Sequence, residues 1–250
     1  MKVSVVTAVL NRSGTIAHTI SSVQGQTHAD VEHVIQDGQS TDGTLDEIRN
    51  HMNDETLLVS EPDSGIYDGI NKGIARATGD IIGLLHADDF FAGVDTLEKI
   101  AAAFDRKGVD GVYGDLQYVS ASDPDRVIRY WRSGEFDRRK LARGWMPPHP
   151  TLYLRRGVFE KWGAYDTSYT IAADYDAILR WLGKGRISLA YIPEVLVNMR
   201  VGGDSNRSFS HIVRKSREDY RAIRSNRMGG FGTLFLKNAS KVGQFFDRGR

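Results

Sequence analysis

The chain has 250 residues, of which 40% are hydrophobic and 26% charged. These values fit a soluble globular protein with room for one large α/β domain, or for one domain and a small appendage. The absence of cysteine excludes disulfides and thiolate metal sites. The N-terminus lacks the apolar segment of a signal peptide, and no stretch approaches the roughly 20 apolar residues of a spanning helix. We therefore expect a cytoplasmic protein.

The net charge of +1 conceals an uneven distribution. Residues 207–250 carry eleven Lys or Arg and three Asp or Glu, a balance of +8, whereas residues 1–206 carry −7. This asymmetry predicts a catalytic body over residues 1–205 and a basic helical tail over 206–250. Anionic lipid on the inner face of the cytoplasmic membrane would suit such a tail. Nucleic-acid binding has only this tail in its favour, so we do not expect it.

Strands and helices alternate along the first third of the chain. Short apolar runs predict strands at residues 3–9, 31–36, 56–60 and 81–85. Helices are predicted between them, from residue 13 or 15 to about 26, and at 45–53 and 67–77. This βαβαβαβ order predicts a mostly parallel sheet with helices on both faces.

The second half of the sequence is less regular. It predicts helices at 96–104 and 172–182, and strands at 111–120, 127–132 and 187–192. Residues 145–150 contain three prolines, too many for a helix or a central strand.

Two adjacent carboxylates, Asp88 and Asp89, directly follow the fourth predicted strand. Ligands of open α/β sheets bind beyond the carboxyl ends of the strands. Buried carboxylates need partners, and Mg²⁺ or Mn²⁺ bridging to phosphate oxygens would be such a partner. The alternative is a helix N-cap before Phe90, which needs only one of the two. His86 is either a further ligand or a hydrogen-bonded structural histidine.

The loops after the second and third predicted strands hold further candidates. Asp37 ends a strand, where a carboxylate can bind a base or ribose, although capping of the next helix explains the same loop. Asp68, Asn71 and Lys72 share one helix face. Lys72 could contact a phosphate, but a surface pair with Asp68 explains it equally well.

The second half adds three candidates. Asp174 falls in the first turn of a predicted helix, where the helix dipole favours negative charge and where a general base could act. His149 is held among prolines. Arg200 precedes the glycine loop 202–205, a combination suited to a diphosphate, but His149 and Arg200 could equally belong to ordinary loops.

In order along the chain, these segments resemble the family 2 glycosyltransferases of the GT-A fold, over roughly residues 1–205. The opening strand 3–11, the loop 37–44, the segments 60–68 and 71–73, Ala87-Asp88-Asp89 and Ala173-Asp174-Tyr175-Asp176 each have a counterpart. Segments 60–68 and 71–73 are similar to a subgroup that acts in bacterial exopolysaccharide or O-antigen assembly.

The resemblance implies a Rossmann-like, mostly parallel mixed sheet flanked by helices, with a nucleotide-binding half at about 1–115 and an acceptor half at about 116–205. It implies an inverting enzyme that moves a sugar from a nucleoside diphosphate, UDP by family habit, to a hydroxyl of a glycan or lipid-linked acceptor. Asp174 would be the catalytic base. Asp88 would bind the metal, helped by Asp89 or His86. The donor-binding residues would be Thr7, Asn11, Asp37, Asp63, Lys72, Asp88 and Arg200, with His149 and Tyr67 on the acceptor side.

Two positions depart from the family pattern. The metal motif often reads Asp-x-Asp, and its first position here is His86. The base segment often reads Glu-Asp, and Ala173 stands here before Asp174. A nucleotidyltransferase is an alternative, although it would need a glycine- and arginine-rich phosphate loop after the first strand, and residues 11–14 match such a loop poorly. A non-catalytic sugar-nucleotide binder or scaffold is a further alternative. No dinucleotide-binding or P-loop glycine motif is present.

The tail has an amphipathic pattern. Its apolar residues at helical spacing are Phe231, Leu234, Phe235, Val242 and Phe245, with Lys237 and Lys241 nearby. This pattern predicts peripheral membrane contact through residues 231–246. The alternative is a helix packed on the domain.

Overall fold

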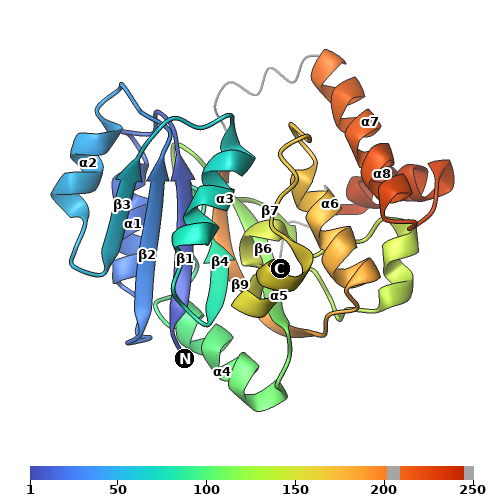
Figure 1. Ribbon diagram of the computed structural model, residues 1–250, viewed down its shortest axis with the longest axis horizontal. Helices are drawn as coiled ribbons and strands as arrows, with labels where there is room; N and C mark the ends of the chain where they lie inside the picture. Colours follow the sequence, from blue (N-terminus) through green and yellow to red (C-terminus); the bar gives the residue numbers. More distant parts are fainter. Residues whose placement is uncertain (202–208, 245–250) are drawn as a thin grey trace.

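The computed structural model describes the backbone of residues 1–201 and 209–244, and the side chains in these ranges except at 107, 209, 210 and 240–244. The glycine loop at 202–205 and the side chains of Lys241, Val242 and Phe245 therefore lie outside the described residues. The described chain forms one mixed sheet covered by helices on both faces (Figure 1).

Four parallel strands form the first half of the sheet, as the sequence predicts. Their order is β3 (Thr56–Ser60), β2 (Val31–Asp37), β1 (Val3–Val9) and β4 (Ile81–Leu84). Every residue of β1 is buried, as expected of a parallel strand with helices on both sides. The crossover helices are α1 (Ile16–Gln24), α2 (Thr44–His51) and α3 (Ile66–Arg76).

The second half of the sheet is mixed. β8 (Tyr153–Arg155) runs antiparallel between β4 and β6 (Gly111–Ser120), and β6 pairs in parallel with β9 (Leu189–Val201). β7 (Val127–Trp131) and the two-residue β5 (Phe90–Phe91) complete it. The predicted strand at 187–192 is too short, because β9 follows β6 over its full length. β5 also shows that no helix begins after Asp89, which removes the N-cap explanation of that residue.

Helices in the second half cover both faces of this mixed region. α4 (Thr96–Lys107) was predicted, whereas α5 (Arg156–Trp162) and the 3₁₀ turn η1 (Arg138–Arg143) were not. The predicted helix at 172–182 is α6 (Ala173–Leu179), continued by a π-helical turn, η3 (Arg180–Lys184). The proline segment ends in the 3₁₀ turn η2 (His149–Thr151), which agrees with its exclusion from helix and central strand.

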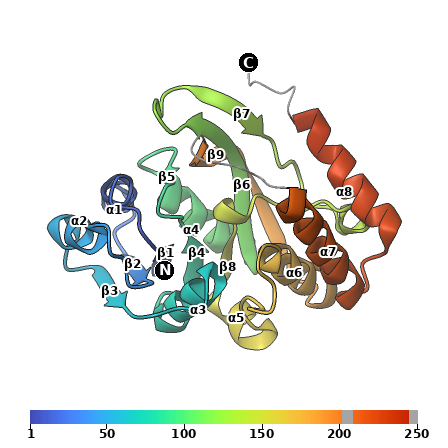
Figure 2. The ribbon, with the colours of Figure 1, turned by 90° about the horizontal axis from the view of Figure 1, so that it is seen from above.

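The C-terminal helices α7 (Phe209–Ser225) and α8 (Phe231–Gln244) pack beside α6 and η1 (Figure 2). Asn226 donates to Asp176 at 2.8 Å, and the Thr233 hydroxyl donates to the Ala142 carbonyl at 2.8 Å. On α8, Thr233 and Lys237 are buried, while Phe231 and Phe235 are exposed. The inner face of α8 thus follows the packed alternative, and its outer face retains the exposed apolar side chains. No helix among the described residues is long and apolar enough to cross a membrane.

Candidate active site

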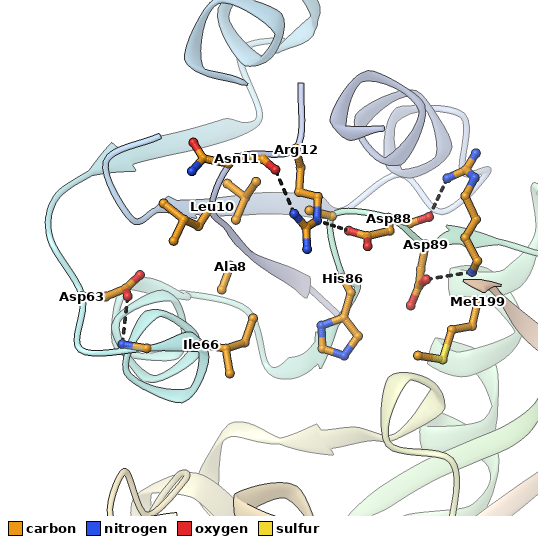
Figure 3. Close-up of a pocket in the computed structure, with 14 residues that line it drawn as sticks. Ala8, Leu10, Asn11, Arg12, Asp63, Ile66, His86, Asp88, Asp89 and Met199 are labelled. Atoms are coloured by element: carbon orange, nitrogen blue, oxygen red, sulfur yellow. Dashed lines mark hydrogen bonds and ion pairs between the residues drawn. The ribbon is translucent and has the colours of Figure 1, made fainter. Parts of the chain in front are cut away.

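A cleft of about 560 Å³ opens at the carboxyl ends of β1 and β4 (Figure 3). The residues that line it come from four regions: the loop after β1, the loop before α3, the segment after β4, and the end of β9. They are Ala8, Val9, Leu10, Asn11, Arg12, Asp63, Gly65, Ile66, His86, Ala87, Asp88, Asp89, Met199 and Arg200. The cleft lies where an open α/β sheet is expected to bind a ligand.

Asp88 and Asp89 both line this cleft but differ in exposure. The side chain of Asp88 is 42% exposed, and its Oδ1 accepts from Arg12 Nε at 3.1 Å. Asp89 is buried, and its Oδ1 accepts from the backbone N–H of Arg200 at 3.2 Å. The Arg200 guanidinium donates to the Asp88 carbonyl at 2.5 Å and to His18 Nδ1. Arg200 therefore braces the two-aspartate segment from the neighbouring strand β9.

The donor atoms at Asp88 and Asp89 fit a hard divalent cation. Asp89 Oδ2 is buried and has no hydrogen-bond partner among the described residues. Burial, with the Asp88 charge added, raises the pKa of Asp89 to about 8 despite the opposing effect of Arg200. No three His, Cys, Asp or Glu side chains within the described ranges gather closely enough to hold a metal by themselves. A cation here would need further oxygen ligands, which the diphosphate of a donor can supply.

Two other predicted donor-binding residues line the cleft. Asn11 adopts a left-handed backbone conformation, with φ of 52°, and its Oδ1 accepts from the Thr41 N–H at 2.9 Å. Asn11 thus joins the loops that follow β1 and β2. Asp63 accepts from the Gly65 N–H at 2.9 Å, and Gly38 lies so close to it that an added Cβ would meet Asp63 Oδ2 at 2.5 Å. A glycine at position 38 is therefore required by the packing around Asp63.

Thr7 and Asp37 are not among the residues that line the cleft. The Thr7 hydroxyl is buried, donates to the Leu85 carbonyl at 2.8 Å and lies 2.9 Å from His33 Nε2. The Asp37 carboxylate is buried and accepts from Ser40 Oγ at 2.5 Å and from Ser60 Oγ at 2.6 Å. The structure gives both side chains internal partners instead of a place on the cleft surface.

Lys72 likewise lies away from the cleft lining. Its Nζ donates to the Pro62 carbonyl at 2.6 Å and is 3.4 Å from Asp68 Oδ2. The surface pair of Lys72 with Asp68, which is the alternative to a phosphate contact, is therefore present.

A second, smaller pocket of about 190 Å³ adjoins the first, and His86 and Met199 line both. Asp174 and His149 both line it. Its other walls come from β6, β7 and the two C-terminal helices. The two pockets thus bring together carboxylates that are far apart in the sequence, Asp88 and Asp174.

Asp174 lies in the first turn of α6, where the sequence places it. The Tyr67 hydroxyl donates to the Ile171 carbonyl at 2.7 Å and lies 3.4 Å from Asp174 Oδ1. Burial, reinforced by the Asp174 charge, raises the pKa of Tyr67, so this hydroxyl stays protonated. Tyr67 therefore supports the segment that carries Asp174.

His86 lines both pockets. Its ring centroid lies 6.0 Å from that of His149, and His149 Nε2 is 2.7 Å from the Tyr165 hydroxyl. Burial lowers the pKa of His86 although Asp88 and Asp174 both act to raise it. Burial also lowers the pKa of His149 to about 4. Both imidazoles are therefore neutral near pH 7 and add no positive charge to the site.

Glu218 on α7 holds the loop that leads into α6. Its Oε2 atom accepts from the backbone N–H groups of Thr170, Ile171 and Ala172, at 3.1, 2.7 and 3.0 Å respectively. A C-terminal helix therefore positions the segment 170–172, which ends two residues before Asp174. Nothing local in the sequence indicates this contact, because 46 residues or more separate its partners.

Replacing Glu218 by Ala should lower both stability and turnover. The change leaves three N–H groups without their carboxylate, which we expect to cost about 2 kcal/mol of unfolding free energy. We also expect turnover to fall while ligand binding in the larger cleft stays unchanged, because neither α6 nor α7 contributes a residue to that cleft. Urea unfolding and steady-state kinetics measure the two effects, with Glu160→Ala, at an exposed position of α5, as the control. Unchanged values for both quantities would show that the loop does not depend on Glu218.

Arg12 is the cleft residue that sequence reasoning missed. It belongs to the turn at 11–14, directly after the first strand, and a basic residue at that sheet edge was the available signal. Its contact with Asp88 joins residues 76 positions apart.

The chain is an α/β protein with two adjoining pockets, and comparison with known proteins identifies its family. The profile of Glycosyl transferase family 2 matches residues 4–163. The chain belongs to this family and is a glycosyltransferase. A PGL/p-HBAD biosynthesis glycosyltransferase of Mycobacterium bovis is 31% identical over 209 residues, which cover 81% of this chain and 78% of that protein. An uncharacterized glycosyltransferase of Nostoc is 32% identical over 218 residues, covering 82% and 66%.

Solved structures share the fold. S. aureus TarS 1–349 in complex with UDP-GlcNAc has a TM-score of 0.69 at 16% identity, covering 90% of this chain and 65% of that one. The mannosyltransferase PcManGT of Pyrobaculum calidifontis, in complex with GDP-Man and Mn²⁺, has a TM-score of 0.66 at 17% identity, covering 97% and 74%. The expected GT-A fold is thereby confirmed.

Proposed function

We propose that this enzyme transfers a sugar from a nucleoside diphosphate, UDP in the first instance, to an acceptor hydroxyl with inversion at the anomeric carbon. The observation that carries this proposal is the pair of adjoining pockets, one with Asp88 and the other with Asp174, joined at His86 and Met199. Attack by a hydroxyl requires a base on the face opposite the leaving diphosphate, and the two carboxylates lie in separate pockets.

The donor cleft would hold the nucleotide and its diphosphate. Asn11 and Asp63 line the end of the cleft formed by the loops after β1 and β3, and we assign them to the nucleoside. Arg12 and the Asp88 carboxylate lie where the diphosphate would reach. Guanidinium groups bind phosphate oxygens well, so donor binding would release Arg12 from Asp88 toward the diphosphate. The UDP-GlcNAc complex of TarS, a protein of the same fold, supports a UDP-sugar donor.

We assign a divalent cation, Mg²⁺ or Mn²⁺, to Asp88 with Asp89 beside it. When bound, the cation would neutralise the charge that develops on the leaving diphosphate. The unpartnered oxygen of Asp89 and the Mn²⁺ of the PcManGT complex support this assignment. His86 stands where the family often has an aspartate, so fewer carboxylates are available than in an Asp-x-Asp site.

Asp174 would act as general base in a single displacement. The O–H bond of the acceptor breaks, and its proton passes to the Asp174 carboxylate. The acceptor oxygen forms a bond to the anomeric carbon while the bond from that carbon to the diphosphate oxygen breaks. The nucleoside diphosphate leaves with the bonding electrons, and the neutral His86 and His149 line the same pocket as Asp174.

The stereochemistry of the product tests this mechanism. Incubation with a panel of UDP-sugars and hydroxyl acceptors should release UDP and yield a glycoside whose anomeric configuration is opposite to that of the donor. ¹H NMR of the product reads the anomeric coupling constant directly. Retention of configuration would contradict the single displacement, and release of UDP without any glycoside would contradict transfer.

We also propose that the acceptor is a glycan or lipid-linked sugar of bacterial polysaccharide assembly, met at a membrane surface. Phe231 and Phe235 are each 73% exposed and Leu236 is 44% exposed, all on α8 at one end of the molecule (Figure 2). An exposed apolar helix face on a tail with a net charge of +8 suits anionic lipid. The buried face of the same helix contributes to the wall of the acceptor pocket.

The double variant Phe235→Ser and Leu236→Ser should reduce recovery with anionic vesicles at least about tenfold, because both side chains lie exposed on the proposed contact. Cosedimentation with vesicles of phosphatidylglycerol and phosphatidylcholine measures the recovery. The control is Leu57→Ser and Val94→Ser, which removes exposed apolar groups remote from α8. Equal recovery of all three proteins would remove the membrane contact from the proposal.

A further inference from the structure

The wall of the smaller pocket that α7 and α8 supply is charged. Lys215 and Asp219 on α7 and Lys237 on α8 all line this pocket, together with Asp174 and Tyr175 of α6. Asp219 Oδ2 lies 2.7 Å from the Lys215 ammonium, and Asp219 Oδ1 lies 2.5 Å from the Lys237 ammonium. One carboxylate of α7 thus contacts two ammonium groups, one on its own helix and one on α8, in the pocket that also contains Asp174.

Burial makes this arrangement costly. Lys237 and Asp219 are each 2% exposed in their side chains, whereas the side chain of Lys215 is 37% exposed. Removing a lysine charge from water costs several kcal/mol, and a buried pair is often no more stable than apolar packing. Burial alone would raise the pKa of Asp219, but Lys237 and Lys215 outweigh it and hold that pKa below its usual value. Lys237 and Asp219 join α8 to α7, and Lys215, one helical turn before Asp219, is the more exposed of the two lysines in this pocket.

Tyr175 provides a second, independent observation. It is 1% exposed, its ring lies under the Lys237 ammonium at 3.4 Å from the centroid, and it lines the same pocket. Its hydroxyl is buried and has no hydrogen-bond partner within the described part of the chain. A buried hydroxyl without an acceptor loses free energy, and a ligand oxygen in the pocket would restore its hydrogen bond.

We propose that Lys215, Lys237 and the Tyr175 hydroxyl form a subsite for an anionic oxygen group of the acceptor, either a phosphate or a carboxylate. The inference rests on the proposed assignment of this pocket to the acceptor. An anionic group here would accept hydrogen bonds from the ammonium groups and from Tyr175. The accepting hydroxyl of the same molecule would then be directed toward Asp174, which lines the same pocket. The tail would therefore select the acceptor by its charge as well as complete the pocket.

Probe titrations test the subsite apart from catalysis. With UDP and Mg²⁺ at saturation to fill the donor cleft, glucose, glucuronate, glucose 1-phosphate and a polyprenyl phosphate in neutral detergent micelles are titrated by NMR. We expect at least one anionic probe to bind about tenfold more tightly than glucose. Preference for glucuronate would identify a carboxylate acceptor, and preference for the two phosphates would identify a phosphorylated one.

Variants at Lys215 separate recognition from packing. Lys215→Gln should bring the dissociation constants of the anionic probes to within about threefold of that for glucose, and Lys215→Arg should keep the preference. Lys184→Gln, which removes an exposed lysine outside this pocket, should behave as the wild type. Equal binding of glucose and all anionic probes by the wild type, or a preference that survives Lys215→Gln, would overturn the subsite. Failure of the wild type to bind UDP would instead contradict the proposed function. The comparison of the dissociation constants for glucuronate and glucose would still decide the subsite in that case.

Discussion

Replacement of Asp174 by Asn should reduce kcat on the order of 10³-fold, because the amide cannot take the proton from the acceptor hydroxyl. The substitution preserves the size of the side chain and the hydrogen bond that Tyr67 could give it. Nucleotide affinity should stay within a few-fold of the wild type, since Asp174 lines the smaller pocket and not the donor cleft. Steady-state transfer rates and nucleotide titrations measure these two quantities.

The matched control is Asp105→Asn, at an exposed position of α4. It makes the same chemical change on a helix that contributes no residue to either pocket. Normal turnover by Asp174→Asn would contradict the assignment of the base. A parallel loss of nucleotide binding would indicate that the variant disturbs the donor cleft, and the thermal unfolding temperature of each variant identifies any loss of folded protein.

Replacement of Asp88 by Ala should remove the part of nucleotide affinity that depends on Mg²⁺ or Mn²⁺. The wild type should bind the nucleotide at least tenfold more tightly with metal than without it, and the variant should bind equally in both conditions. The fold should persist, because the Asp88 side chain is 42% exposed and pairs with Arg12 at the surface. Such pairs contribute little to stability.

Calorimetric titration with and without Mn²⁺ measures this prediction, again with Asp105→Ala as the control. A metal effect that persists in Asp88→Ala would move the cation to another place in the cleft. The same titration on His86→Ala would show whether the departure from Asp-x-Asp leaves histidine as a ligand: a neutral imidazole can bind such a cation, although oxygen ligands suit it better.

The sequence predicts the first half of the fold well because its signals are local. The four strands β1 to β4 and their crossover helices follow from apolar runs, turn residues and the right-handed connection of parallel strands. β8 and the extension of β9 to Val201 were missed. Both are determined by pairing with β6, a contact between distant segments that no local pattern reveals.

Of the residues that the sequence proposes for the site, some line the cleft and others are buried beside it. Asp88, Asp89 and Asp63 follow strands and line the cleft, as their positions indicate. Thr7 is buried within β1 and its hydroxyl donates to the Leu85 carbonyl, whereas Ala8 and Val9, nearer the carboxyl end of the strand, line the cleft. The Asp37 carboxylate accepts hydrogen bonds from Ser40 in its own turn and from Ser60 at the end of β3.

The contribution of the tail could not be predicted in the same way. Composition indicated a basic helical segment and an apolar face, and both are present in the described residues. The contacts of Glu218 with the loop before α6, and of Lys215 and Lys237 with the acceptor pocket, depend on how α7 and α8 pack on α6. Helix packing of this kind joins residues that carry no mutual signal in a single sequence.

The most direct test of the central claim, that the cleft at Asp88 is a metal-assisted nucleotide site, is calorimetric titration of the wild type with UDP, GDP and dTDP, each with and without Mn²⁺. We expect one of the three, UDP, to bind, and to bind at least about tenfold more tightly with the metal. Binding of none of the three, with or without Mn²⁺, would contradict the assignment of this cleft as the donor site.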